Sequence, residues 1–165
     1  MTKDEHLLEI VLEAWERSNE ILVNLLRSVP QGELGAKALE GSPTVAAMFH
    51  HMHHERMISL YEEAPEFGGE LPAKEWESED DVEKMAAKLV ESARRIREAV
   101  RSRVEQGRAL DRSYDHPILF LQLLMFHEAY HHGQIKLALK TQGQPIPDEM
   151  AGPLTWDVWR RRRAS

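Results

Sequence analysis

The chain has 165 residues and a net charge of −7, and 42% of its residues are hydrophobic. These values are typical of one soluble globular domain covering residues 1–165. The negative charge argues against nucleic acid or an anionic membrane as a partner. Because the chain has no cysteine, disulfides, cysteine-type zinc sites and a cysteine nucleophile are all excluded.

The sequence carries no recognisable targeting or membrane segment. Its first residues lack the basic and apolar regions of a signal peptide. The longest apolar stretch, Ile118 to Phe126, has nine residues and is too short to span a bilayer. We therefore expect a cytoplasmic protein.

Four segments show the helical period, and none shows the sustained alternation of a strand. The first helix is expected over about residues 4–28, where Pro30 and Gly32 follow as stop signals. The second is expected to begin at Ser42, an N-cap residue with Pro43 at the first helical position, and to continue to about Glu63.

The third helix is expected over about residues 79–107 and the fourth over about 117–141. Between the second and third helices, residues 64–77 are rich in Pro, Gly and Glu, and this connection is long enough to cross back along the helices. A short apolar segment around Trp156 and Trp159 follows the fourth helix. The prediction is an all-α fold: a four-helix bundle with a long connection between helices 2 and 3 and a short C-terminal helical tail.

Histidines gather in two short clusters on the second and fourth predicted helices. Imidazole is the commonest side-chain metal ligand, and two histidines four residues apart share one face of a helix. The second cluster also spells H-E-x-x-H, a motif with two ligands on one helix face and a carboxylate beside them. Seven of the nine histidines belong to these clusters: His50, His51, His53, His54, His127, His131 and His132.

On a helical wheel of the fourth helix with His127 at zero, His131 lies at about 40° and Leu123 at about −40°, within the expected apolar face. Glu128 lies at about 100°, on the flank, and His132 at about 140°, towards solvent. The two ligand candidates are therefore expected to point into the core. One shared metal ion would satisfy both buried imidazoles.

On the second helix, His51 lies between the core positions Met48 and Ile58, so we predict it as the third ligand. The other histidines of this cluster are expected to face solvent or to support the ligands from outside, and an adventitious binding patch is their alternative interpretation. Three protein nitrogens leave one coordination position open, as in catalytic zinc sites. The ligand type alone suits zinc, nickel, copper or ferrous iron.

At these residues the chain resembles the DinB/YfiT-like superfamily of metalloenzymes. Members are four-helix bundles with one histidine on the second helix and an H-x-x-x-H pair on the fourth. The fourth-helix signature H-E-x-H-H-R-G-Q-I corresponds to residues 127–135, HEAYHHGQI, and the second-helix element H-x-H-x-x-R to residues within 49–56, FHHMHHER. The tail, with its W-D-V-W at residues 156–159, is similar to the family's W-D-W ending.

The resemblance implies a bundle fold, a bound metal and a ligand role for His51, in agreement with the wheel. Some relatives are transferases of low-molecular-weight thiols, one branch includes a thiol-dependent isomerase, and many have no assigned activity. Here His132 replaces the family's usual arginine and Tyr130 a frequent histidine, so a role of that arginine with an anionic substrate or at an interface does not carry over.

We therefore expect a metal-dependent hydrolase or low-molecular-weight-thiol transferase acting on a small molecule or thiol. One divalent metal, zinc or nickel and alternatively iron, is expected on three histidines, and a homodimer is expected as the assembly. The expected site consists of the ligands His51, His127 and His131, the catalytic candidate Glu128, and the supporting residues Glu55, Tyr130 and Gln134.

Two alternatives have different functions. A zinc peptidase would use Glu128 as its general base, but no third histidine follows at the required spacing and no strand is predicted to bind a peptide. A non-enzymatic protein would bind metal for stability, or serve as a dimeric sensor or stress-induced binding protein. An open coordination position favours the enzyme, and a closed four-ligand site favours the structural role.

Overall fold

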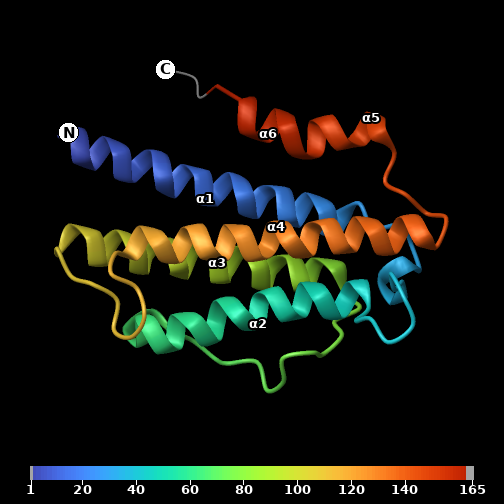
Figure 1. The fold of residues 1–165 in the computed structure, drawn as a ribbon, viewed down its shortest axis with the longest axis horizontal. Helices are drawn as coiled ribbons and strands as arrows, with labels where there is room; N and C mark the ends of the chain where they lie inside the picture. The colour runs from blue at the N-terminus through green and yellow to red at the C-terminus, as the bar shows by residue number, and fades with distance from the viewer. Residues whose placement is uncertain (1, 163–165) are drawn as a thin grey trace.

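The computed structural model describes residues 2–162, and all the regular elements within that range are helical. The all-α prediction is therefore confirmed. Four long helices lie side by side, with a short helical tail beyond them (Figure 1), an arrangement consistent with the expected four-helix bundle. The long helices are α1 (Lys3–Arg27), α2 (Val45–Glu63), α3 (Val82–Glu105) and α4 (Pro117–Thr141).

The chain direction differs from that of a simple up-and-down bundle. In Figure 1, α1 and α4 run one way, while α2 and α3 both run the other way. The connection from α2 to α3, residues 64–81, therefore returns along the length of the helices, as its predicted length allows. It contains one short 3-10 turn, η2 (Pro65–Phe67), and another such turn, η1 (Glu33–Gly35), joins α1 to α2.

Two predicted helix starts were wrong by a few residues, and side-chain caps explain the difference. The second helix is capped by Thr44, whose hydroxyl accepts a 3.1 Å hydrogen bond from Ala47 N, and not by Ser42. The third helix begins after Asp81, whose carboxylate accepts from Lys84 N at 3.0 Å. The fourth helix has the bounds that were predicted.

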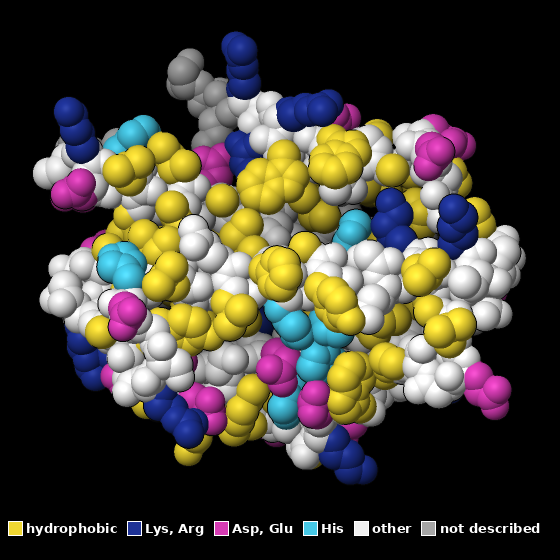
Figure 2. Space-filling model, in the orientation of Figure 1, with side chains coloured by type: hydrophobic (Ala, Val, Ile, Leu, Met, Phe, Trp, Pro, Cys, Tyr) yellow, Lys and Arg dark blue, Asp and Glu magenta, His cyan; other side chains and the backbone are white. Residues whose placement is uncertain are grey.

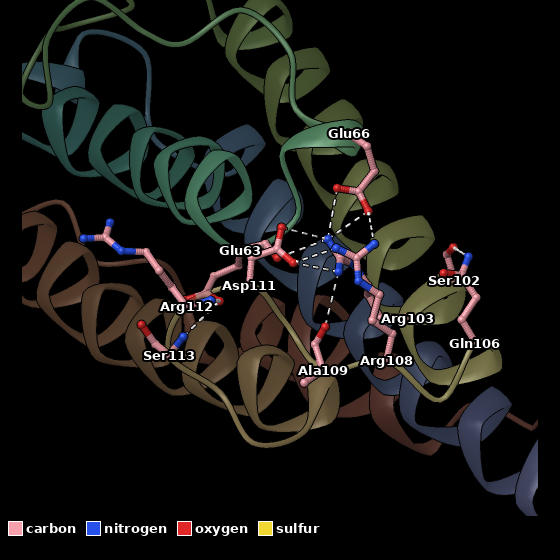
Figure 3. Close-up of polar contacts among 10 residues, drawn as sticks. All are labelled: Glu63, Glu66, Ser102, Arg103, Gln106, Arg108, Ala109, Asp111, Arg112 and Ser113. Atoms are coloured by element: carbon pink, nitrogen blue, oxygen red, sulfur yellow. Dashed lines mark hydrogen bonds and ion pairs between the residues drawn. The ribbon is translucent and has the colours of Figure 1, made fainter.

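A buried arginine anchors the end of α3 to the neighbouring connections (Figure 3). The guanidinium of Arg103, fully buried, donates to Asp111 Oδ1 at 2.8 Å and to Glu66 Oε2 at 3.0 Å. The carboxylate of Glu63 accepts from the backbone of Arg112 and Ser113 in the α3–α4 connection. This network holds the C-terminal end of α2 near the start of α4, so the two helices that carry the histidines are fixed relative to each other.

The tail consists of α5 (Asp148–Ala151), the π-helical turn η3 (Gly152–Trp156) and α6 (Asp157–Arg160). It packs along α1, where the Arg17 guanidinium donates to the carbonyls of Val158 at 2.8 Å and Trp159 at 2.6 Å. Within residues 2–162, none of the helices combines the length and the apolar character needed to cross a bilayer.

Candidate metal centre

The ring nitrogens of three histidines from two helices meet at one point. His51 Nε2 on α2 lies 3.2 Å from His127 Nε2 on α4, and His131 Nε2 lies 3.0 Å from the same atom. His51 and His131 are buried, and His127 is partly exposed at the edge of the group. These three residues are the ones predicted from the sequence, and their nitrogens could hold a metal ion together.

The spacing of the nitrogens matches the requirements of a cation. Four ligands at zinc–nitrogen distances near 2.1 Å form a tetrahedron whose edges are about 3.4 Å long. The two contacts of 3.0 and 3.2 Å are close to that edge length. Two edges of such a tetrahedron are therefore matched in the protein, and both meet at His127 Nε2.

The proton positions also favour a cation over a simple hydrogen-bonded cluster. His131 Nδ1 donates to the Gln134 side-chain oxygen at 2.7 Å, so its Nε2 presents a lone pair to the other rings. Without a metal, the one N–H at His127 Nε2 would then have to donate to both His51 Nε2 and His131 Nε2. One cation accepts the lone pairs of all three imidazoles, so the donor set fits a divalent metal.

Gln134 is itself held in place by the next aromatic side chain on α4. Its amide nitrogen donates to the Tyr130 hydroxyl at 3.0 Å, which leaves the amide oxygen turned towards His131. The ring of Tyr130 also meets that of His131 edge to face, with centroids 5.1 Å apart. The structure thus joins the two predicted supporting residues Tyr130 and Gln134 to one ligand candidate.

The surroundings keep the ligand candidates neutral, which is the form that binds metal. Burial, and then the neighbouring rings of His131 and His127, lower the pKa of His51 to about 4. Burial, followed by the nearby His127, also lowers the pKa of His131. At neutral pH both imidazoles are therefore available as lone-pair donors.

Glu128 lies in the core and not on the flank where the wheel placed it. It is 3% exposed, and its two oxygens accept from Arg56 Nε at 2.6 Å and Nη2 at 2.9 Å. The remaining guanidinium nitrogen, Arg56 Nη1, donates to Asn19 Oδ1 at 2.9 Å and to the Leu89 carbonyl at 2.7 Å. The ion pair links α2 to α4, and Glu128 directly follows His127 in the sequence. The Arg56 guanidinium also lies 4.8 Å from the centroid of the Trp15 ring.

The reason for this difference is the direction of the inward face of α4. Its buried residues centre at about 70° on the wheel on which His127 is at zero. Glu128 at about 100° is therefore inside, and Leu123 at about −40° is outside, with 50% of its surface exposed. His127 falls at the edge of the face and is therefore partly exposed. His132, expected in solvent, is partly buried, and burial lowers its pKa.

The other histidines of α2 were expected to face solvent or to support the ligands from outside, and two of the three do not face solvent. His50 and His53 are buried, because the connection from α2 to α3 covers this end of the helix. His54, which is partly exposed, lies 3.3 Å from Glu55 Oε1. Glu55 is near the cluster as predicted, since one of its carboxylate oxygens lies within 4.8 Å of a ring nitrogen of His51.

Two residues of this connection reach the cluster and were not predicted from the sequence. The Trp76 ring stacks on the His51 ring with centroids 4.1 Å apart and planes 4° from parallel. The Glu75 carboxylate lies 3.0 Å from His51 Nδ1, although not in the direction of a regular ring hydrogen bond. The only sequence signal was a Trp and acidic residues in a connection long enough to pass over the second helix.

The cluster is reached from one face of the molecule. In Figure 2, histidine side chains gather near the middle of that face, with acidic and large hydrophobic side chains beside them. Several hydrophobic side chains of α4 are exposed and form a stripe along the helix: Leu119, Leu123, Phe126, Tyr130 and Leu137. The fold and the site define an all-helical protein with a candidate metal centre of three histidines.

The comparison with known families agrees with this description. The sequence model of the DinB superfamily matches residues 14–135, and the chain belongs to that superfamily. The matched range contains all three clustered histidines and the Arg56–Glu128 pair. No curated protein and no solved structure matches the chain.

Proposed function

We propose that the protein is a metal-dependent enzyme, a hydrolase or a low-molecular-weight-thiol transferase, with one divalent ion held by His51, His127 and His131. The convergence of three Nε2 atoms at 3.0 and 3.2 Å is the observation that carries the proposal. Imidazole ligands suit zinc, nickel, copper or ferrous iron, and among these we propose zinc or nickel, with ferrous iron as a further candidate. The substrate is a small molecule or a thiol, because the net charge of −7 disfavours nucleic acid.

When bound, the ion would lower the pKa of a water molecule towards ~7, or would lower that of an incoming thiol, and so supply a nucleophile at neutral pH. The protein residues prepare this position. The side-chain oxygen of Gln134 accepts a hydrogen bond from His131 Nδ1 and so keeps the Nε2 atom of His131 directed to the centre. Neutral imidazoles leave the full charge of the ion available to polarise what binds there.

Glu128 supports the scaffold in this proposal and is not the general base. Both of its oxygens accept hydrogen bonds from Arg56, and the carboxylate is buried in the core and is not among the groups that meet at the three-histidine site. This also argues against the peptidase alternative, in which Glu128 would be the base. The described residues 2–162 offer no strand to pair with a peptide either.

Metal content tests the proposal. Purified protein should carry about one divalent ion per chain by elemental analysis, as three-histidine sites do. His51→Ala, His127→Ala and His131→Ala should each lose most of it, whereas His132→Ala should keep it. His132 is a matched control, because it follows His131 directly but is not one of the three histidines whose nitrogens meet. Full retention of metal by His127→Ala would overturn the proposal.

An open coordination position separates an enzyme from a protein that binds metal for stability alone. In cobalt-substituted protein, the visible absorption of the ion should change when a small thiol is added, since the thiol would enter the free position. An unchanged spectrum at millimolar thiol would favour the structural role.

A further inference from the structure

The segment Glu75 to Glu77 of the α2–α3 connection is attached to α2 through histidines. His50 Nδ1 donates to the Glu75 carbonyl at 3.2 Å, and His50 Nε2 lies 3.5 Å from a carboxylate oxygen of Glu77. Trp76 lies between these two residues and stacks on His51. The connection is therefore fixed directly over one of the three ligand candidates.

His51 has one ring nitrogen in the cluster and one outside it. Because Nε2 is directed to His127, the Nδ1 atom must carry the proton when His51 binds a metal. Nδ1 is buried and makes no regular hydrogen bond in the structure. A carboxylate oxygen of Glu75 is 3.0 Å away, and the side chain of Glu75 is 46% exposed, so a small rotation would bring it into line.

His131 has a hydrogen-bond acceptor for its Nδ1 atom that His51 lacks. His131 Nδ1 has its acceptor, the Gln134 oxygen, on its own helix. His51 has no equivalent acceptor in regular geometry on α2, where the nearest candidate, Glu55, also lies 3.3 Å from His54. Metal-binding histidines almost always donate their second N–H to a carboxylate, a carbonyl or a water molecule. Glu75 is placed to be that carboxylate.

We propose that Glu75 is a positioning residue for the metal centre: its carboxylate accepts a hydrogen bond from the Nδ1–H of His51 and so fixes this ring as a ligand. His50 holds the backbone of Glu75 in place, and Trp76 holds the plane of the His51 ring. The long connection is thus part of the site. This inference rests on the proposed metal centre and adds a residue to it that touches no metal.

Zinc affinity, measured by competition with a chromogenic chelator, tests the role of Glu75. Removing the carboxylate partner of a ligand histidine typically weakens metal binding by about 10- to 100-fold. We expect this loss in Glu75→Ala and a smaller one in Glu75→Gln, whose amide oxygen can still accept a hydrogen bond. Glu70→Gln is the matched control, because Glu70 lies in the same connection and its replacement changes the net charge equally.

A second measurement uses Trp76 as a reporter. Cobalt(II) bound at the centre should quench the fluorescence of a tryptophan stacked on a ligand ring. We expect Trp76→Phe to lose most of the cobalt-dependent quenching, and Trp159→Phe, in the C-terminal tail, to retain it. Quenching unchanged in Trp76→Phe would contradict the placement of Trp76 over the metal.

The outcomes separate this inference from the proposal on which it rests. If the wild type binds no zinc, the proposed metal centre fails. If the wild type binds zinc but Glu75→Ala binds it as tightly as Glu70→Gln, the metal centre stands and the role of Glu75 is overturned. If Glu55→Gln shows the loss instead, Glu55 is the positioning carboxylate and the assignment to Glu75 is wrong.

Discussion

Arg56 and Glu128 form an ion pair in the core, with exposed side-chain fractions of 0% and 3%. We expect Glu128→Ala to lower the free energy of unfolding by about 3–5 kcal/mol, because it leaves the Arg56 charge buried without its partner. The double variant Arg56→Met, Glu128→Met should recover much of the loss. Urea unfolding of metal-free protein measures both.

The control for this pair is an exposed arginine with similar partners. Arg94 bonds Glu91 at 2.7 Å and Glu98 at 2.6 Å, but its side chain is 51% exposed. Arg94→Ala should change the free energy of unfolding far less than Glu128→Ala does, because exposed ion pairs contribute little. An effect of Glu128→Ala as small as that of Arg94→Ala would show that the buried pair contributes little.

Acid should destabilise the metal-free protein through His53. Burial, and then the nearby Arg56 charge, lower the pKa of His53 in the folded protein to about 4, from 6.5. The unfolded chain therefore binds this proton first as the pH falls, and the free energy of unfolding decreases between pH ~6.5 and about 4. Unfolding curves at several pH values should show a shallower decrease in His53→Gln.

His6 provides the comparison for this titration, because it is exposed on the first turn of α1. His6→Gln should leave the pH dependence as it is in the wild type. If His53→Gln retained the full acid sensitivity of the wild type, the effect would have to be assigned to other groups.

At the scale of single residues, the sequence predicted which histidines meet and named Tyr130, Gln134 and Glu55 beside them, but not the residues that distant segments contribute. The i, i+4 spacing of His127 and His131 is a local property of a helix, so the wheel could use it. The acceptor for Arg56 and the residues above His51 depend on how distant segments pack. The helical wheel therefore placed Glu128 wrongly on the flank of the helix, and the contact of Glu75 with His51 was not predicted.

At the scale of elements, the cap of α2 offers a direct test. Thr44→Ala should lower the free energy of unfolding by about 1 kcal/mol, because the Ala47 N–H loses its side-chain acceptor. Ser42→Ala is the control at the position expected from the sequence. Equal effects of the two substitutions would contradict the cap assignment. Circular dichroism during urea unfolding is sufficient to compare them.

The ends of the helices show why local signals differ in strength. The start of α4 at Pro117 was predicted correctly, because proline is favoured at the first helical position and has no N–H to lose there. The Ser42-Pro43 pair gave a similar signal two residues too early. The backbone of Val45 instead donates to the distant Ala36 carbonyl at 3.0 Å, a tertiary contact that the pattern could not contain.

The length of the α2–α3 connection predicted that it could return along the bundle, but not which residues it contacts. A connection of this length can return along the bundle and make α2 and α3 parallel, as Figure 1 shows. Only the three-dimensional arrangement reveals that residues 75–77 of this segment contact α2 at His50 and His51. These contacts bury side chains that the helical wheel had placed towards solvent.

For the whole molecule, the exposed stripe of α4 leads to a prediction about assembly. Phe126 is 74% exposed and Leu123 is 50% exposed, on the same face of the helix. Contiguous apolar surface of this kind often marks a protein–protein contact. The tail cannot cover it in the described structure, because residues 148–160 pack on α1. We propose that a second copy of the chain covers the stripe in a symmetric dimer.

Light scattering should then give about twice the chain mass of 19.0 kDa at micromolar concentration. Phe126→Glu should shift the protein to the monomer, because it places a charge in the centre of the buried stripe. Leu39→Glu is the matched control, since Leu39 is also 74% exposed but lies in the connection between α1 and α2. A wild type that is monomeric at these concentrations, or a dimer that survives Phe126→Glu, would exclude this interface. Tyr130 belongs to the stripe and also accepts a hydrogen bond from Gln134 beside the ligand candidate His131, so dimer formation would narrow access to the candidate metal centre.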